Sequence, residues 1–148
     1  MVEVTGIDHI YISVSDLTAS EAFYNAVLRD VLGFRQNRFE LAADLHVQYY
    51  NRHFGYVLRP AKSGPVHDNY APGLHHLCFR VHTIADVQTA ARELAERGIS
   101  CTAPALYPDY APDYWATFLY DPDGIRLEIT NYRQERQWRH DHWDDQPA

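Results

Sequence analysis

The sequence contains little cysteine, no excess of basic residues and no long apolar run, and each of these shortages excludes a class of protein. Two cysteines among 148 residues, Cys78 and Cys101, are too few for a disulfide framework. No apolar run approaches the ~20 residues that cross a bilayer, and no basic segment followed by an apolar one opens the chain. We therefore expect a cytoplasmic protein that has no membrane partner.

The charge balance is acidic, which argues against nucleic acid as a partner. Twenty Asp and Glu residues against 13 Lys and Arg residues give a formal net charge of -7, and no basic stripe is present. The length of 148 residues is enough for one domain, or for one domain built from two similar halves. A hydrophobic content of 46% is that of an ordinary globular protein.

Two stretches, residues 6–14 and 73–81, share a pattern that is typical of strands. In each stretch, aliphatic or aromatic residues alternate with polar ones at a period of two. The polar face begins with His9 in the first stretch and with His76 in the second. The two histidines therefore occupy the same position in two predicted strands.

A third strand-like stretch, residues 124–130, carries a carboxylate on its polar face, at Glu128. Two imidazoles and one carboxylate suit iron(II), manganese(II), zinc, nickel or cobalt, and three protein ligands leave coordination positions open. Such an ion could polarise a carbonyl or hydroxyl group or acidify bound water. We therefore hypothesise that His9, His76 and Glu128 bind one divalent metal ion. The alternative is that both histidines are half-buried strand residues satisfied by hydrogen bonds; their repeated position favours the metal.

The first half of the chain, residues 1–60, is predicted to form a β-α-β-β-β module. Thr18 and Glu21 have the spacing of a capping box, so a helix should begin there and end at Gly33. The apolar face of this helix comprises Phe23, Val27, Leu28, Val31 and Leu32. The three strands that follow are expected at residues 34–38, 45–51 and 56–59.

The second half, residues 73–132, repeats this plan after a linker at residues 61–72 that is rich in proline and glycine. A cap at Thr83 should begin a helix that ends at Gly98. The other expected elements are a strand at 74–81, a short strand or the beginning of one at 99–102, a loop at 104–113, a strand at 115–120, a tight turn at 121–124 and a strand at 125–130. A tail, residues 133–148, is expected to contain a short helix.

Three landmarks recur at nearly the same offset, which argues for two homologous modules. The offset is 67 residues from His9 to His76, 65 from Gly33 to Gly98, and 69 from Gly55 to Gly124. A module of this size cannot bury both faces of its sheet alone. We therefore expect an α+β fold in which paired βαβββ modules form a curled mixed β-sheet around a metal-binding cleft, with the helices on the outside.

Further candidates lie on the same strand faces as the proposed ligands. Tyr11 and Cys78 follow the two histidines by two positions, so both should line the cleft. Tyr11 could orient substrate, transfer a proton or only pack the cleft, and packing is favoured for Cys78. Arg126 shares a face with Glu128. We predict Tyr11 and Glu128 as catalytic residues, and Cys78 and Arg126 as substrate-binding residues.

An aromatic segment precedes the last hairpin of the second module. It contains Tyr107, Tyr110, Tyr114 and Trp115. These side chains suit an aromatic or otherwise planar ligand, or a dimer contact. We count Tyr114 among the predicted substrate-binding residues.

The sequence resembles the vicinal oxygen chelate superfamily, which includes glyoxalase I, fosfomycin-resistance enzymes, extradiol dioxygenases and bleomycin-resistance proteins. The resemblance covers nearly all of residues 5–132 and is carried by residues 8–10, 23–34, 75–77 and 121–128. It implies paired βαβββ modules, a metal held by His9, His76 and Glu128, substrates that chelate the metal through adjacent oxygens, and a homodimer.

Departures from the pattern of the superfamily bear on the reaction. Glyoxalase I uses a fourth ligand from the last strand of its first module, and matching Gly55 to Gly124 places Arg59 opposite Glu128. Arg59 could bind an anionic substrate group or form a surface salt bridge. Extradiol dioxygenases typically carry a tyrosine near the metal ligands at the position where this chain has Phe118, and residues 103–117 contain no histidine. No potassium-binding loop of the fosfomycin-resistance type is recognised.

We therefore expect a metal-dependent enzyme of this superfamily that acts on a small oxygen-chelating molecule. Glyoxalase-like lyase or isomerase, ring-opening and dioxygenase chemistries remain open, because fold alone does not define the reaction. The alternative is a non-enzymatic small-molecule binder of the bleomycin-resistance type. Such binders lack the ligands, so the presence of all three ligand-type residues favours an enzyme.

Overall fold

The computed structural model describes residues 2–145, which form two compact units. The first unit comprises Met1–Asp68 and Asp121–Ile125, and the second comprises Asn69–Tyr120 and Arg126–Ala148. The first unit thus includes a short segment that the sequence analysis assigned to the second half. Among the described residues, no helix combines the length and apolar character needed to span a bilayer.

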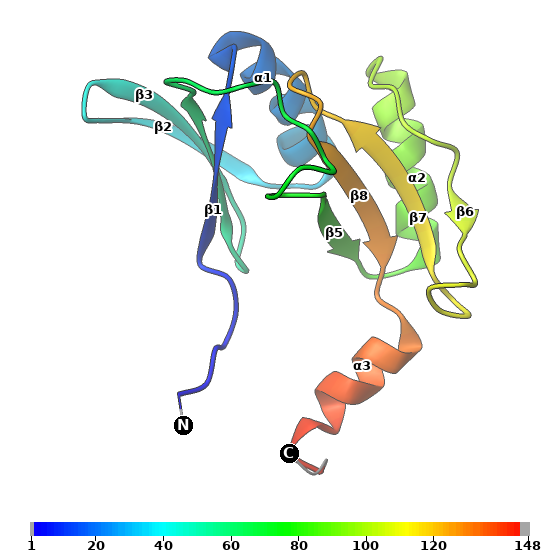
Figure 1. Cartoon of the computed structure of the whole chain (residues 1–148). Helices are drawn as coiled ribbons and strands as arrows, with labels where there is room; N and C mark the ends of the chain where they lie inside the picture. The colour runs from blue at the N-terminus through cyan, green and yellow to red at the C-terminus, as the bar shows by residue number, and fades with distance from the viewer. Residues whose placement is uncertain (1, 146–148) are drawn as a thin grey trace. The chain divides into compact units, whose positions relative to one another are not determined.

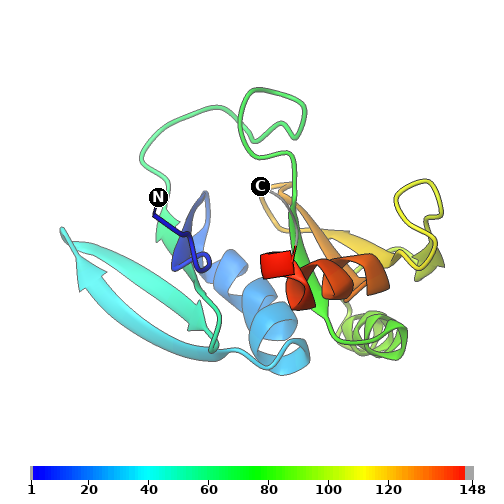
Figure 2. The ribbon, with the colours of Figure 1, turned by 90° about the horizontal axis from the view of Figure 1, so that it is seen from below.

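The first unit is a four-stranded mixed sheet with a helical segment after its first strand (Figure 1). The strands lie in the order β1-β4-β3-β2, with β1 parallel to β4 and the other neighbours antiparallel. Figure 2 shows the β2–β3 hairpin extending away from the helix of this unit. The elements are β1 (His9–Val14), α1 (Leu17–Tyr24), the π-helix η1 (Asn25–Val31), β2 (Arg35–Leu41), β3 (Asp44–Tyr50) and β4 (Gly55–Pro60).

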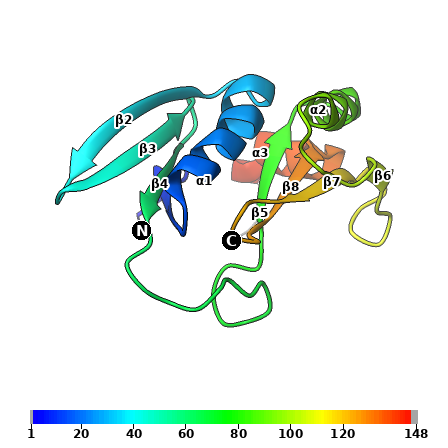
Figure 3. The same cartoon turned by 90° about the horizontal axis from the view of Figure 1, so that it is seen from above.

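The second unit repeats this topology, with the strand order β5-β8-β7-β6 and β5 parallel to β8. Figure 3 shows α2 lying alongside the sheet of this unit. Its elements are β5 (Leu77–Val81), α2 (Ile84–Glu96), β6 (Ala105–Leu106), β7 (Trp115–Tyr120), β8 (Arg126–Asn131), α3 (Gln134–Asp141) and the 3-10 turn η2 (Trp143–Asp145). The predicted α+β class and the two βαβββ modules are confirmed.

Helix α2 begins where the sequence predicted. The Thr83 hydroxyl accepts a hydrogen bond from the Asp86 backbone N–H at 3.1 Å, and the Asp86 carboxylate accepts one from the Thr83 N–H at 2.9 Å. This reciprocal pair satisfies two backbone donors that would otherwise lack partners. The face of α2 that carries Val87, Ala90, Ala91 and Leu94 is buried. It covers the apolar face of the sheet, as alternation along the strands predicted.

The start of helix α1 differs from the prediction. Asp16, not Thr18, caps it: the Asp16 backbone is extended and its carboxylate accepts a hydrogen bond from the Ala19 N–H at 2.9 Å. Aspartate is a strong capping residue, and here its carboxylate satisfies a backbone N–H of the first turn that has no partner within the helix. The helix then widens into η1, in which the Leu32 N–H donates to the Val27 carbonyl five residues back. Tyr24, the last residue of α1, is fully buried, whereas the predicted Phe23 is only partly buried.

The second strand of the second module lies later in the chain than residues 99–102. Residues 99–102 form no strand beyond an isolated bridge between Cys101 and Leu119, and β6 lies instead in the predicted loop. Pro104 has no N–H to donate and so interrupts the pairing between these segments. The Thr102 side chain replaces a ladder bond, since its hydroxyl accepts from the Phe118 N–H at 2.9 Å.

A buried polar network ties the core of the first unit together. The Tyr24 hydroxyl donates to the Asp121 carboxylate at 2.8 Å and lies 2.9 Å from the Tyr56 hydroxyl. The other Asp121 oxygen accepts from the backbone N–H groups of Asp123 and Ile125 at 2.9 and 2.8 Å. Burial raises the pKa of Asp121 above its ordinary value, although these hydrogen bonds oppose the shift.

This raised pKa predicts a pH dependence of stability. Because folded Asp121 binds its proton more tightly than the unfolded chain does, its contribution to stability is fully present below the ordinary pKa of 3.8 and is lost as pH rises through the folded pKa. The free energy of unfolding of wild type minus that of Asp121→Asn should therefore fall as pH rises from about 4 to 7. Urea titrations across this range measure the difference. Glu3→Gln, at an exposed carboxyl, is the charge-matched control, and equal slopes for Asp121→Asn and wild type would contradict the prediction.

Candidate metal and substrate site

Glu128 is a buried carboxylate at the centre of the polar face of the second unit. Its side chain is 4% exposed, and its Oε1 accepts a hydrogen bond from the Tyr114 hydroxyl at 2.5 Å. Its Oε2 lies 3.2 Å from His76 Nε2. Cys78 is its direct cross-strand neighbour on β5. The structure thus brings together four of the residues that the sequence analysis selected.

His76 lies immediately before β5 and has its second ring nitrogen engaged. Its Nδ1 is 2.7 Å from Nδ1 of His75, so one of these nitrogens donates and the other accepts. With the proton on Nδ1 of His76, its Nε2 presents a lone pair toward Glu128. The His75 ring packs edge-on against Tyr70, with the ring centroids 5.2 Å apart.

His9, the first residue of β1, shows the same arrangement in the first unit. Its Nδ1 lies 2.6 Å from the Asp8 carboxylate, which can only accept, so the Nδ1–H donates. A carboxylate that holds one imidazole nitrogen leaves the other with a free lone pair, as in ligating histidines. About half of the His9 side chain is exposed, so the free nitrogen is accessible. Tyr11 packs edge-on against the His9 ring at a centroid distance of 5.5 Å.

The pair formed by His76 and Glu128 has a spacing that fits metal ligands. Two ligand atoms that each lie about 2.1 Å from one ion are roughly 3.0–3.4 Å apart in octahedral or tetrahedral geometry. The 3.2 Å between His76 Nε2 and Glu128 Oε2 falls within this range. Within residues 2–145, however, no group of three or more His, Cys, Asp or Glu side chains is assembled. The set of three ligands that includes His9 stays a prediction.

The protonation states of Cys78 and Tyr114 follow from their surroundings. Burial and the nearby Glu128 carboxylate raise the pKa of the Cys78 thiol to about 12, so it is neutral at physiological pH. Burial and the hydrogen bond to Glu128 likewise raise the pKa of the Tyr114 phenol. Tyr114 therefore acts as a hydrogen-bond donor to the carboxylate, and the Cys78 thiol is no nucleophile in this state.

The strand pairing shows that the residue of the first unit that corresponds to Glu128 is Val57, and not Arg59 as predicted. Tyr11 pairs with Val57 in the first unit, and Cys78 pairs with Glu128 in the second. Because Tyr11 and Cys78 each follow the histidine of their unit by two residues, the counterpart of Glu128 is Val57. The predicted match failed because β4 begins at its glycine, whereas β8 begins two residues after its own.

Val57 is 2% exposed and carries no donor atom, so the position of a fourth ligand is apolar. Arg59 instead binds the Asp44 carboxylate at 2.9 Å, and Lys62 binds the same carboxylate at 3.0 Å. The hydrogen bond from Lys62, together with the charges of both cations, lowers the pKa of Asp44. A role for Arg59 in substrate binding stays a prediction.

Arg126 is placed two residues before Glu128 on the same face of β8. Its guanidinium lies over the Phe118 ring, 4.4 Å from the centroid. Its Nε is buried and has no hydrogen-bond partner among the described residues. A buried N–H without a partner is costly, so this donor is available to a ligand acceptor close to the carboxylate.

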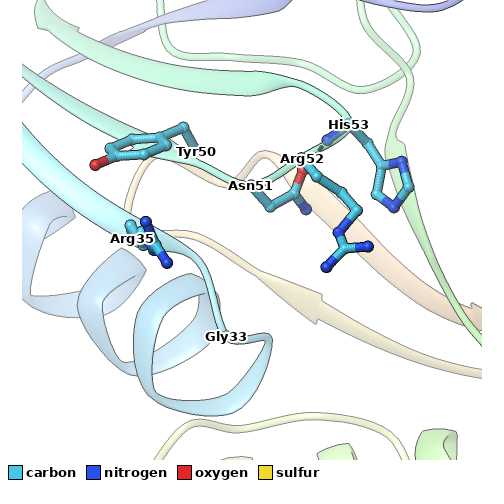
Figure 4. Close-up of a pocket in the computed structure, with 6 residues that line it drawn as sticks. All are labelled: Gly33, Arg35, Tyr50, Asn51, Arg52 and His53. Atoms are coloured by element: carbon cyan, nitrogen blue, oxygen red, sulfur yellow. Dashed lines mark hydrogen bonds between the residues drawn. The ribbon is translucent and has the colours of Figure 1, made fainter.

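Two features of the first unit escaped sequence reasoning. His46, a histidine of β3, is 2% exposed, and its ring stacks on Phe39 and meets Tyr11 edge-on. The alternation along β3 could have indicated that His46 shares the polar face. The second feature is a cavity of about 510 Å³ at the open end of the β2–β3 hairpin, where β2 begins and β3 ends. Its lining residues, shown in Figure 4, are Gly33, Arg35, Tyr50, Asn51, Arg52 and His53.

Comparisons with known proteins agree with this fold. Residues 6–129 match the Glyoxalase/Bleomycin resistance protein/Dioxygenase superfamily. The uncharacterized protein YaeR of Escherichia coli K12 is 30% identical over 138 residues, which cover 87% of this chain and 98% of YaeR. The virulence protein STM3117 of Salmonella typhimurium is 29% identical over 131 residues, covering 85% and 83%.

A solved structure gives the same result. The glyoxylase/bleomycin resistance protein/dioxygenase domain from Frankia sp. EAN1pec superposes with a TM-score of 0.72 at 25% identity. The similarity covers 88% of this chain and 100% of the Frankia domain. The likeness therefore extends over both βαβββ units.

Proposed function

The chain belongs to the glyoxalase/bleomycin resistance protein/dioxygenase superfamily, and from this premise we propose that it is a metal-dependent enzyme. The proposed substrate is a small molecule that chelates the metal through two oxygen atoms. The proposed ligands are His9, His76 and Glu128, and the ion is iron(II), manganese(II), zinc, nickel or cobalt. A homodimer is part of the proposal.

The observation that supports the proposal best is the environment of Glu128. A carboxylate that is 4% exposed is costly to bury unless a cation and hydrogen bonds compensate it. Tyr114 supplies a hydrogen bond to one oxygen, and the second oxygen faces an imidazole nitrogen at metal-ligand spacing. A divalent cation bound by this oxygen and by His76 would supply the missing charge.

The side chains around Glu128 have separate roles in the proposed reaction. The bound metal would polarise two oxygens of the substrate, which is the step shared by lyase, isomerase, ring-opening and dioxygenase chemistry. Tyr114 holds one Glu128 oxygen and so orients the other toward His76. Arg126 offers its unpartnered Nε–H to a substrate oxygen, and the neutral Cys78 lines the site. Tyr11 orients the substrate or transfers a proton next to His9.

Metal analysis of the wild-type protein tests the proposal. Protein purified without chelator, or reloaded separately with each of the five ions, should hold close to one equivalent per chain. Calorimetric titration of each ion into chelator-treated protein gives the affinity. If none of the ions binds, the proposal fails, and the superfamily's alternative of a metal-free small-molecule binder takes its place.

A further inference from the structure

The cavity at the open end of the β2–β3 hairpin has the chemistry of an anion site. Two guanidinium groups, an imidazole, a phenol and an amide line it, and none of its six lining residues is acidic. Its volume of about 510 Å³ is that of a small-molecule site, which spans roughly 300–1,000 Å³. In Figure 4, Arg35 and Tyr50 lie at one side of the cavity, and Arg52 and His53 lie at the other.

Both walls of the cavity are held by defined contacts. The Phe34 and Phe54 rings meet edge-on at 5.6 Å and so join the turn after η1 to the β3–β4 loop. The Asn51 side-chain oxygen accepts from the backbone N–H groups of His53 and Phe54 at 2.8 and 3.1 Å. This bonded turn places the loop residue Arg52 at the rim of the cavity. The opposite turn passes through Gly33, whose φ of +70° disfavours other residues.

The two arginines of the cavity differ from the others of the first unit. Arg29, Arg38 and Arg59 each bind a carboxylate, at 2.7, 2.6 and 2.9 Å. In the part of the chain that the structure describes, Arg35 and Arg52 have no ion-pair partner, although the chain carries a net charge of -7. Two unpaired guanidiniums around one cavity favour a carboxylate or phosphate group, which each can bind through paired N–H donors.

Two residues that line the cavity, Arg35 and Tyr50, lie on the same sheet face as His9. His9 pairs with Gly55, Gly55 with Tyr50, and Tyr50 with Arg35, so the four residues form one row across the sheet. Gly55 leaves this row open, because a Cβ there would lie 3.2 Å from the Gln48 amide nitrogen and 3.4 Å from the His9 Cβ. Three strand spacings separate Arg35 from His9, which is about 14 Å between Cα atoms.

We propose that this cavity binds a carboxylate or phosphate group of a small ligand. The further claim that this group is the acidic end of the substrate rests on the function proposed above. The acid then occupies the cavity beside Arg35 and Arg52, and the oxygens that chelate the metal extend along the row toward His9. The substrate class is thus an elongated organic acid with two adjacent oxygens distant from its acidic group.

Titration with inorganic phosphate tests the cavity without any metal. The full-length protein is treated with chelator and titrated by calorimetry and by amide NMR. Arg52→Ala is the test variant, because this loop side chain is exposed and, within residues 2–145, forms no ion pair that the substitution would break. Arg92→Ala, an exposed site on α2, removes the same charge elsewhere. We expect phosphate to bind wild type and Arg92→Ala equally and Arg52→Ala at least about tenfold more weakly. Equal binding to all three proteins, or none to wild type, would overturn the anion site.

A second arm asks whether the anion belongs to the substrate. The probes are 2-hydroxy dicarboxylic acids of increasing chain length, titrated with and without manganese(II). If the acid end occupies the cavity, manganese should strengthen binding only for the longer acids, and Arg52→Ala should remove that gain. If manganese helps all lengths equally and Arg52→Ala has no effect on the gain, the cavity holds a free anion and the substrate claim is wrong. Failure to bind any metal would sink the proposed function, whereas the phosphate result would stand.

Discussion

Glu128→Gln is expected to reduce the affinity for a divalent metal by at least about 100-fold. The amide keeps the size of the side chain and its oxygen can still accept from the Tyr114 hydroxyl, but the negative charge is lost. His76 then faces a neutral amide across the 3.2 Å contact, and an amide binds a divalent metal more weakly than a carboxylate does. Calorimetric metal titration, with circular dichroism to verify folding, measures the change.

Tyr114→Phe is the matched control for this variant. It removes the 2.5 Å hydrogen bond to Glu128 but keeps the carboxylate, so the affinity should fall by only about tenfold. A larger loss of metal affinity in Glu128→Gln than in Tyr114→Phe would distinguish the metal ligand from the residue that orients it. Metal binding by Glu128→Gln that equals wild type would show that the carboxylate does not hold the ion.

Asp121→Ala is expected to lower the free energy of unfolding by about 3 kcal/mol. The change leaves three donors in the first unit without their acceptor: the Tyr24 hydroxyl and the backbone N–H groups of Asp123 and Ile125. Tyr24 is fully buried, so no water replaces the lost partner without a rearrangement of the core. Urea denaturation at neutral pH measures the loss.

Asp123→Ala, in the same turn, provides the comparison. The Asp123 carboxylate accepts one bond, from the Ser15 N–H at 3.0 Å, and this bond is exposed. Its loss should cost less than about 1 kcal/mol. Similar losses for both alanine variants would mean that the turn itself, and not the buried network, accounts for the stability.

Alternation along the strands was sufficient to predict the modules and part of the site. The period of two in a strand is fixed by backbone geometry, so the polar face of β8 and the placement of Glu128 could be read directly. The capping box at Thr83 is similarly local, since both of its bonds join residues three apart. Local chemistry therefore predicted the fold class, the second helix and the placement of Glu128 on the polar face of its strand.

Features that depend on register or on distant segments were not predictable. The match of Gly55 to Gly124 placed Arg59 opposite Glu128. Because β4 begins at its glycine and β8 begins two residues after its own, the residue that corresponds to Glu128 is instead Val57. The anion cavity is built by a turn and a loop that are joined through Phe34 and Phe54, residues 20 positions apart in sequence. No pattern within either segment indicates that they meet.

The segment Asp121–Ile125 belongs to the first unit, although in sequence it joins β7 to β8 of the second unit. A fragment that stops at Asp68 would retain Tyr24 and Tyr56 but lack the carboxylate that accepts a hydrogen bond from Tyr24. A cut at the linker would therefore remove a buried hydrogen bond from the first unit. A replacement of the second half has to preserve the tip at Asp121–Ile125, because this tip completes the core of the first unit.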